Sequence, residues 1–147
     1  MIVRRFAAVL ALALLTACAE RLPVENSPQT AQALEGTYWR LAELDGRPAV
    51  PGISGREAYI RLTAQGERMG GSTGCNGISG TYRVEGDRLR FPQPISSTRM
   101  ACPAVMEQER MFFEALAAAE RFEIAGGRLV LYGGGRPLAR FEAGTPR

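Results

Sequence analysis

The feature that most constrains this chain is a glycine-rich stretch that lies between two cysteines, Cys75 and Cys102. Glycines recur at positions 71, 74, 77 and 80, a run too short for collagen. Glycine permits positive φ angles and close approach of neighbouring backbones. We therefore expect a short strand over 68–71, followed by a tight, irregular crossing of the chain in which Asn76 takes a turn or left-handed conformation.

The first 17 residues read as a secretion signal. Arg4 and Arg5 precede an apolar core, Phe6 to Leu15, that is too short to span a bilayer as a mature helix. The small residues that follow end at Cys18, as in a bacterial lipobox, so Cys18 would become the new N-terminus and carry several acyl chains. The alternative is an ordinary signal peptide with a chance cysteine. Because Ala19 is not the aspartate typical of inner-membrane retention, the expected location is the outer membrane, facing the periplasm, if the cell has two membranes.

Composition excludes several classes of function. The net charge of +3 falls to +1 when Arg4 and Arg5 leave with the leader. The remaining arginines are scattered singly, so no basic footprint for a nucleic acid exists. The chain has no histidine, which excludes Ser-His-Asp and Cys-His catalysis and removes the commonest zinc ligand. Residues 18–34 contain few large apolar side chains and are expected to form a flexible, lipidated tether.

Residues 35–142 carry the patterns of one folded domain. Alternating apolar and polar positions, bounded by turn residues, predict strands over 37–44, 58–63, 80–84, 88–91, 121–125, 128–132 and 137–142. Residues 48–55 read as a loop and residues 143–147 as a loose tail. Trp39 and Tyr82 are expected to be core or sheet-face aromatics. Short antiparallel strands around one helix indicate an α+β domain with a small antiparallel, curled or barrel-like sheet.

The main helix is predicted directly after the second cysteine. Pro103 suits the first helical position, which makes Cys102 the N-cap residue. The apolar stripe of this helix consists of Val105, Phe112, Phe113 and Leu116. The residues expected to face solvent are Glu107, Gln108 and Arg110. Glu109 is the odd residue because it lies close to the apolar stripe, and its expected setting is an exposed edge or an arginine partner.

A set of residues spread over about 36–142 forms a wider pattern. It consists of Trp39-Arg40-Leu41 with Gly46, Gly74-Cys75-Asn76, Gly80, Tyr82, Thr98-Arg99-Met100-Ala101-Cys102, Glu109, Phe112, Leu116 and Leu129-Val130-Leu131. This pattern resembles the META/HslJ domain family. The resemblance implies a small antiparallel β domain with one helix, often on a bacterial lipoprotein. It also implies a loose link to stress, antibiotic tolerance or secretion, and no established enzymatic activity.

The two cysteines outside the leader are expected to form a disulfide. With Cys18 committed to lipid, Cys75 and Cys102 remain as an even pair in an oxidising compartment. The alternative is a thiol-redox site, because a helix N-terminus favours the thiolate of a cysteine placed there. Against it, the chain has no Cys-X-X-Cys motif, and Arg99 is the only nearby cation. Two sulfurs without histidine fill only half of a tetrahedral metal site, so no metal or cofactor is expected.

These features favour a non-enzymatic, lipid-anchored protein of the cell envelope. It would support envelope stress or antibiotic tolerance by binding a protein partner or a lipid-like, apolar ligand, since a curled sheet can hold an acyl chain. Asn76 and Arg99, near the disulfide, are the candidate contact residues. Two enzymatic alternatives stay open, namely thiol-redox chemistry by the cysteine pair and hydrolysis by Glu109.

Overall fold

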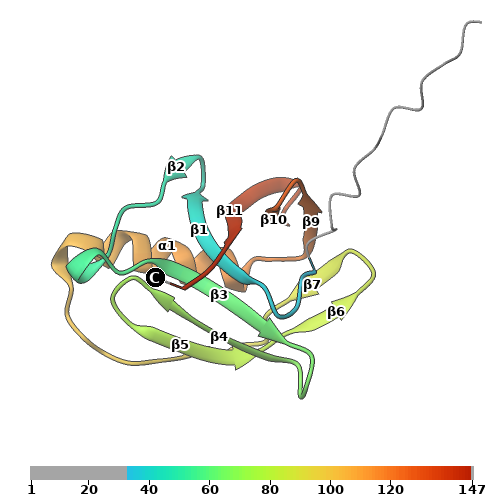
Figure 1. The fold of residues 1–147 in the computed structure, drawn as a ribbon, viewed down its shortest axis with the longest axis horizontal. Helices are drawn as coiled ribbons and strands as arrows, with labels where there is room; N and C mark the ends of the chain where they lie inside the picture. The colour runs from blue at the N-terminus through green and yellow to red at the C-terminus, as the bar shows by residue number, and fades with distance from the viewer. Residues whose placement is uncertain (1–32, 147) are drawn as a thin grey trace, which may run out of the picture.

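The computed structural model describes residues 33–146 (Figure 1). The predicted signal peptide, the predicted lipidation site Cys18 and nearly all of the predicted tether lie outside the described residues. The sheet, the helix, the disulfide and both hydrophobic clusters lie inside them. The described part of the chain contains no helix long and apolar enough to cross a membrane.

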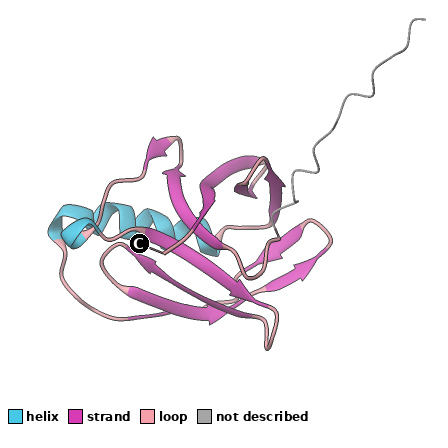
Figure 2. Ribbon diagram, in the orientation of Figure 1, coloured by secondary structure: helices cyan, strands magenta, loops and turns pink. Residues whose placement is uncertain are grey.

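The architecture is one curled antiparallel sheet with one α-helix packed against it (Figures 1 and 2). The longer strands are β1 (Tyr38–Leu44), β3 (Ala58–Thr63), β4 (Arg68–Thr73), β5 (Gly77–Thr81), β9 (Arg121–Ala125), β10 (Arg128–Gly133) and β11 (Arg136–Gly144). The short ones are β2 (Arg47–Pro48), β6 (Arg83–Glu85), β7 (Arg88–Arg90) and β8 (Ser96–Ser97). Neighbours follow the order β6-β7-β9-β10-β11-β1-β3-β4-β5-β8, with β2 beside β1. The predicted α+β class, with a curled antiparallel sheet and one main helix, is confirmed.

Two register shifts help to bend this sheet. One lies between Leu41 and Glu43, where β1 pairs with β11. The other lies between Leu131 and Tyr132, where β10 pairs with β11. An extra residue on one strand bends the ladder and increases its twist. The strands therefore wrap around a core instead of forming a flat sheet.

The core contains the aromatic residues that the sequence places there. Trp39 and Tyr82 are both completely buried, as predicted. Their polar atoms have partners, as buried aromatic donors require: Trp39 Nε1 donates to the Leu34 carbonyl at 2.8 Å, and the Tyr82 hydroxyl donates to the Glu35 carboxylate. Burial, together with this carboxylate, raises the pKa of Tyr82. These two contacts attach the entering chain to the core.

The glycine-rich stretch forms a regular hairpin, so the predicted irregular crossing is wrong. β4 and β5 pair in continuous antiparallel register. Gly71 lies within β4, and a Cβ there would come within 2.2 Å of the Tyr59 carbonyl oxygen. The change of direction is confined to the turn at 74–76, where Gly74 has a φ of +90° and Asn76 follows. Glycine is therefore needed here for close strand packing and for one tight turn.

The helical segment begins at Pro103, as predicted, but its first turn is a 3-10 turn. Pro103–Val105 form this turn, with Cys102 as its N-cap residue. The α-helix α1 then runs over Met106–Ala117 and packs against β1, β4 and β11. Gln108 is buried, which corrects the prediction that it faces solvent.

The last strand is longer than the sequence predicts. β11 continues two residues past the expected domain boundary at 142, because Ala143 and Gly144 pair with Trp39 and Tyr38 of β1. The segment expected to be a loose tail therefore begins as part of the sheet.

Candidate functional site

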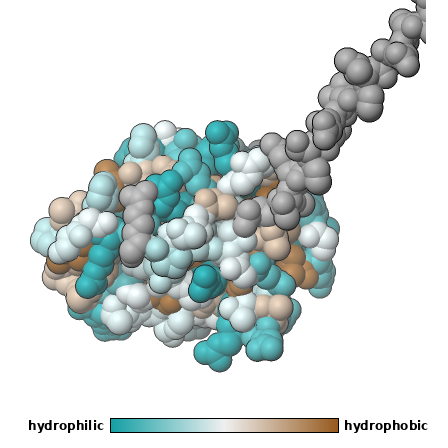
Figure 3. Space-filling view, in the orientation of Figure 1, coloured by the Kyte–Doolittle hydropathy of each residue, from teal (hydrophilic) through white to brown (hydrophobic). Residues whose placement is uncertain are grey.

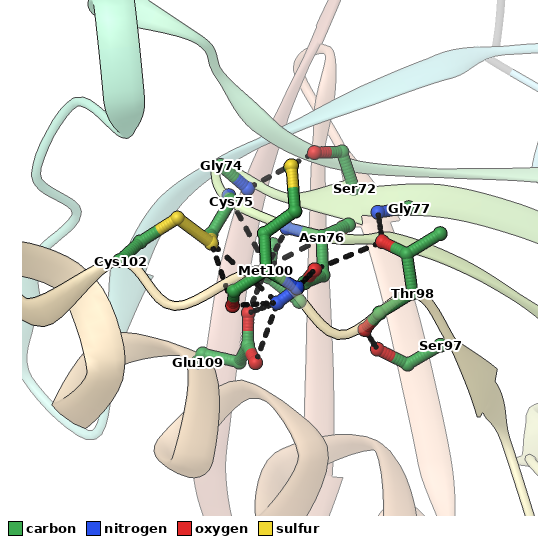
Figure 4. Close-up of a disulfide and its surroundings, with 11 residues drawn as sticks. Ser72, Gly74, Cys75, Asn76, Gly77, Ser97, Thr98, Met100, Cys102 and Glu109 are labelled. Carbon is green, nitrogen blue, oxygen red and sulfur yellow. Dashed lines mark hydrogen bonds between the residues drawn. A yellow bond between two sulfur atoms is a disulfide. The ribbon is translucent and has the colours of Figure 1, made fainter.

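Four segments that are distant in sequence meet at one end of the domain, which we call the disulfide end; Figure 4 shows three of them around the disulfide. They are the β4–β5 turn (74–76), the segment 95–102, the loop 49–56 and the first turns of the helical segment. Cys75 and Cys102 form a disulfide here, with Cα atoms 6.0 Å apart and a sequence separation of 27. Both cysteines are buried and form, with Val105, a hydrophobic cluster separate from the main core. The expected pairing is the one that the structure contains.

The Asn76 side chain is the hub of this end. Its amide nitrogen donates to both oxygens of the Glu109 carboxylate, at 3.0 and 3.1 Å, and to the Met100 carbonyl at 3.1 Å. Its carbonyl oxygen accepts from the Met100 backbone N–H at 2.7 Å and from the Thr98 hydroxyl at 2.9 Å. An asparagine amide has two donor hydrogens and two acceptor lone pairs, so its capacity is filled. Asn76 therefore holds the segment 98–100 against the β4–β5 turn.

Glu109 receives its partners from this turn instead of from an arginine. Its Oε2 accepts from the Thr73 hydroxyl at 2.5 Å, in addition to the amide of Asn76. Thr73 Oγ1 in turn accepts from the backbone N–H groups of Asn76, at 2.9 Å, and Cys75, at 3.3 Å. The expectation of an exposed edge or an arginine partner is therefore corrected. Hydrogen bonds to neutral donors hold the half-buried carboxylate beside the apolar stripe.

The loop before β3 is fixed to the same end by backbone contacts. The buried side chain of Gln108 accepts from the Val50 N–H at 2.7 Å and donates to the Val50 carbonyl at 3.0 Å. Farther along, the Ile53 N–H donates to the Gly74 carbonyl at 3.1 Å. A Cβ on Gly52 would lie only 1.9 Å from that carbonyl oxygen, so glycine is required for this approach. The predicted loop is thus ordered against the disulfide turn.

The chemistry available from the cysteines is limited by their setting. Their sulfurs are bonded to each other, and the exposed fractions of Cys75 and Cys102 are 2% and 6%. α1 begins four residues after Cys102, beyond the 3-10 turn. The geometry therefore presents neither an exposed thiol nor a sulfur directly at the N-terminus of the α-helix. Among residues 33–146, no group of three or more His, Cys, Asp or Glu side chains is arranged to hold a metal ion.

The two candidate contact residues take different positions. Arg99 is exposed on the segment 95–102. This segment, together with Asn76 and Glu109, borders a shallow hollow at the surface. Asn76 has an exposed fraction of only 2% and points into the network (Figure 4). Of the two, the structure therefore leaves Arg99 available to a ligand and gives Asn76 an internal, positioning role.

The structure contains the predicted disulfide, whereas the roles of Asn76 and Arg99 in binding stay predictions. The sequence pattern indicates no role for Thr73, predicts that Gln108 faces solvent, and predicts an exposed edge or an arginine partner for Glu109. The sequence signal for the partners that the structure shows is Glu109 itself, because a carboxylate beside an apolar stripe needs hydrogen-bond donors. A Cys75–Cys102 bridge would bring the polar residues of the turn close to Glu109.

Comparisons with known proteins agree with this fold. A family model described as the META domain matches residues 32–145. An NMR structure of a protein from Burkholderia xenovorans is similar with a TM-score of 0.61 and 22% identity, covering 97% of this chain and 99% of that one. A crystal structure of a DUF4847 family protein from Bacteroides vulgatus has a TM-score of 0.58 and 16% identity, covering 74% and 93%. No curated protein matches the chain.

Proposed function

This chain belongs to the META domain family, and we propose that it is a non-enzymatic, lipid-anchored protein of the cell envelope. Cys18 would carry the lipid, and the outer membrane, with the domain facing the periplasm, is the proposed location. The domain would bind a protein partner or an apolar ligand at the disulfide end. Through this contact it would support tolerance of envelope stress or of antibiotics.

The observation that carries this proposal is the closed network around Asn76. The Asn76 amide donates to the Glu109 carboxylate, which also accepts from the Thr73 hydroxyl, and both ends of the amide bind the backbone of Met100. A catalytic acid or nucleophile must reach a reacting atom. Here the polar groups are hydrogen-bonded to one another. Together they fix the position of the exposed segment that carries Arg99. Such an arrangement supports binding by a fixed surface.

The anchor is tested by the intact mass of the full chain extracted from cell membranes. We expect cleavage before Cys18 and the added mass of a diacylglyceryl group and an N-acyl chain. The Cys18→Ser variant is the control and should lose that mass and leave the membrane fraction. Soluble, unmodified wild-type protein would contradict the anchor.

The contact surface is tested by complementing a strain that lacks the protein. Arg99→Glu should reduce tolerance of the stress to which that strain is sensitive, whereas the same charge change at exposed Arg128, on β10, should not. The purified protein is expected to show no hydrolytic activity, either as wild type or as Glu109→Gln. A hydrolytic activity of the purified protein that disappears in Glu109→Gln would show that the non-enzymatic proposal is wrong.

A further inference from the structure

The exposed large hydrophobic side chains of the described residues all lie at the disulfide end. They are Val50, Ile53, Met100 and Met106, with exposed fractions of 48%, 47%, 47% and 63%. Single exposed apolar residues need no explanation, but a group of them at one end of a domain indicates an interaction site. Figure 3 shows apolar surface at the end of the molecule where α1 begins, at the left of the view.

The backbone that carries these side chains is held by the contacts described above. The Val50 N–H and carbonyl both bind the Gln108 side chain, and the Ile53 N–H binds the Gly74 carbonyl. The Met100 backbone binds Asn76 through both its N–H and its carbonyl group. Met106 directly follows Val105, a member of the small disulfide cluster. These contacts and the disulfide therefore fix the backbone from which the four apolar side chains extend.

Two exposed arginines flank this surface. Arg99 directly precedes Met100 and Arg56 lies three residues after Ile53, and neither forms an ion pair with any residue in 33–146. Of the nearby acids, Glu107 is paired with Arg110, and half-buried Glu109 is held by the neutral donors Thr73 and Asn76. Unpaired cations beside exposed apolar groups match the chemistry of an anionic lipid surface, which offers phosphates above hydrocarbon.

We propose that the disulfide end lies on an anionic membrane surface. The four apolar side chains would enter the boundary between headgroups and acyl chains, and Arg56 and Arg99 would contact lipid phosphates. Of the two occupants allowed by the proposed function, a protein partner and an apolar ligand, this proposal commits to the second, in the form of a lipid surface. Met is also an adaptable side chain for an irregular apolar surface.

The chain is long enough for this placement if Cys18 is the anchor. The anchor is the part of this proposal that rests on the proposed function. Cys18 and Ala33 are fifteen residues apart, and such a segment spans at most roughly 50 Å when extended. A domain of this size has a radius of gyration of about 13 Å. The connection can therefore reach around the domain from its entry near Leu34 to an anchor beside the disulfide end.

The test uses a chain that begins at Cys18 and lacks natural lipid. With Cys75 and Cys102 bonded, Cys18 is the only free thiol, so it can be coupled to a maleimide lipid in vesicles whether or not cells lipidate it. Oxidation of Met100 and Met106 by dilute peroxide is followed by peptide mass spectrometry, with buried Met69 as the internal control. Phosphatidylcholine vesicles are compared with vesicles that also contain phosphatidylglycerol.

We expect both exposed methionines to react several-fold more slowly on the anionic vesicles, while Met69 stays slow on both. The double variant Arg56→Glu with Arg99→Glu should lose this protection. The matched double variant Arg88→Glu with Arg128→Glu, which makes the same charge change at exposed residues of β7 and β10, should keep it.

Equal oxidation on the two kinds of vesicle would overturn the proposal, as would equal loss of protection in both double variants. Protection that appears only when a second protein is added would assign the surface to a protein partner and would also overturn it. Because coupling at Cys18 is chemical, none of these results depends on natural lipidation, which the intact-mass experiment tests separately.

Discussion

The disulfide end and the closing strands of the sheet are held together in different ways. Strands β9, β10, β11 and β1 are joined by antiparallel backbone ladders with two register shifts, and their inner face packs into the main core. The disulfide end has a small hydrophobic cluster, a covalent bond and hydrogen bonds between named side chains. Hydrophobic packing tolerates many side chains of suitable size. A filled polar network does not, since each lost partner leaves a buried group unsatisfied.

The largest effect is expected from the core of the closing strands. Phe141 of β11 is completely buried and packs against Phe112 of α1, with ring centroids 6.1 Å apart. Replacing it by alanine should lower the free energy of unfolding by about 3–5 kcal/mol, because it removes apolar contacts and leaves a cavity. Urea unfolding measures this change, and Arg128→Ala on neighbouring β10 serves as the surface control, expected within about 0.5 kcal/mol of wild type. Equal stability of the two variants would contradict the assignment of Phe141 to the core.

The second effect concerns the covalent bond of the disulfide end. The double variant Cys75→Ala with Cys102→Ala should lose roughly 3–4 kcal/mol of unfolding free energy on the chain-entropy model, because the unfolded chain is no longer constrained. The same unfolding experiment measures it, with reduced wild-type protein as the second reference. An unchanged unfolding free energy in both would mean that the side-chain network alone holds this end.

A smaller effect is expected when the carboxylate of the network is changed with little change in shape. Glu109→Gln places amide hydrogens where Thr73 and Asn76 already donate, so about 1–3 kcal/mol of stability should be lost. The matched control is Glu114→Gln on the same helix, where the carboxylate is exposed and binds Arg110; its change should be within about 0.5 kcal/mol. Similar melting temperatures for the two variants would contradict the claim that the hydrogen bonds of Glu109 stabilise the fold.

The smallest change in the free energy of unfolding at neutral pH is expected for a substitution of Tyr38. At high pH the same substitution should have a measurable effect. Burial and then the nearby Glu57 carboxylate raise the pKa of Tyr38 from 10.0 to about 12. Because the pKa of Tyr38 is higher in the folded protein than in the unfolded chain, the unfolded chain loses this proton first. The free energy of unfolding therefore falls as the pH rises from about 10 to about 12. Tyr38→Phe should flatten the dependence of the unfolding free energy on pH in that window. An equally steep dependence in the variant would contradict the shift.

The contrast between the two regions also explains what the sequence could predict. In β1 and β10, inner and outer positions alternate, so Trp39 and Leu129 were assignable from the period of the pattern. The β4–β5 hairpin was missed because its glycines hide the alternation. The partners of Glu109 lie 33 and 36 residues away in the chain, and no local pattern connects them. The pattern also predicts that Gln108 faces solvent, because its partner Val50 is 58 residues away in the chain.

The most direct test of the central claim, that Asn76 fixes the surface of the disulfide end, is hydrogen exchange at the Met100 amide. This N–H donates to Asn76 Oδ1 at 2.7 Å. In wild-type protein it should be protected, and in Asn76→Ala it should exchange about 10- to 100-fold faster, while the Leu129 amide of β10 changes much less. A Met100 amide that exchanges at the same rate in both proteins would contradict the claim.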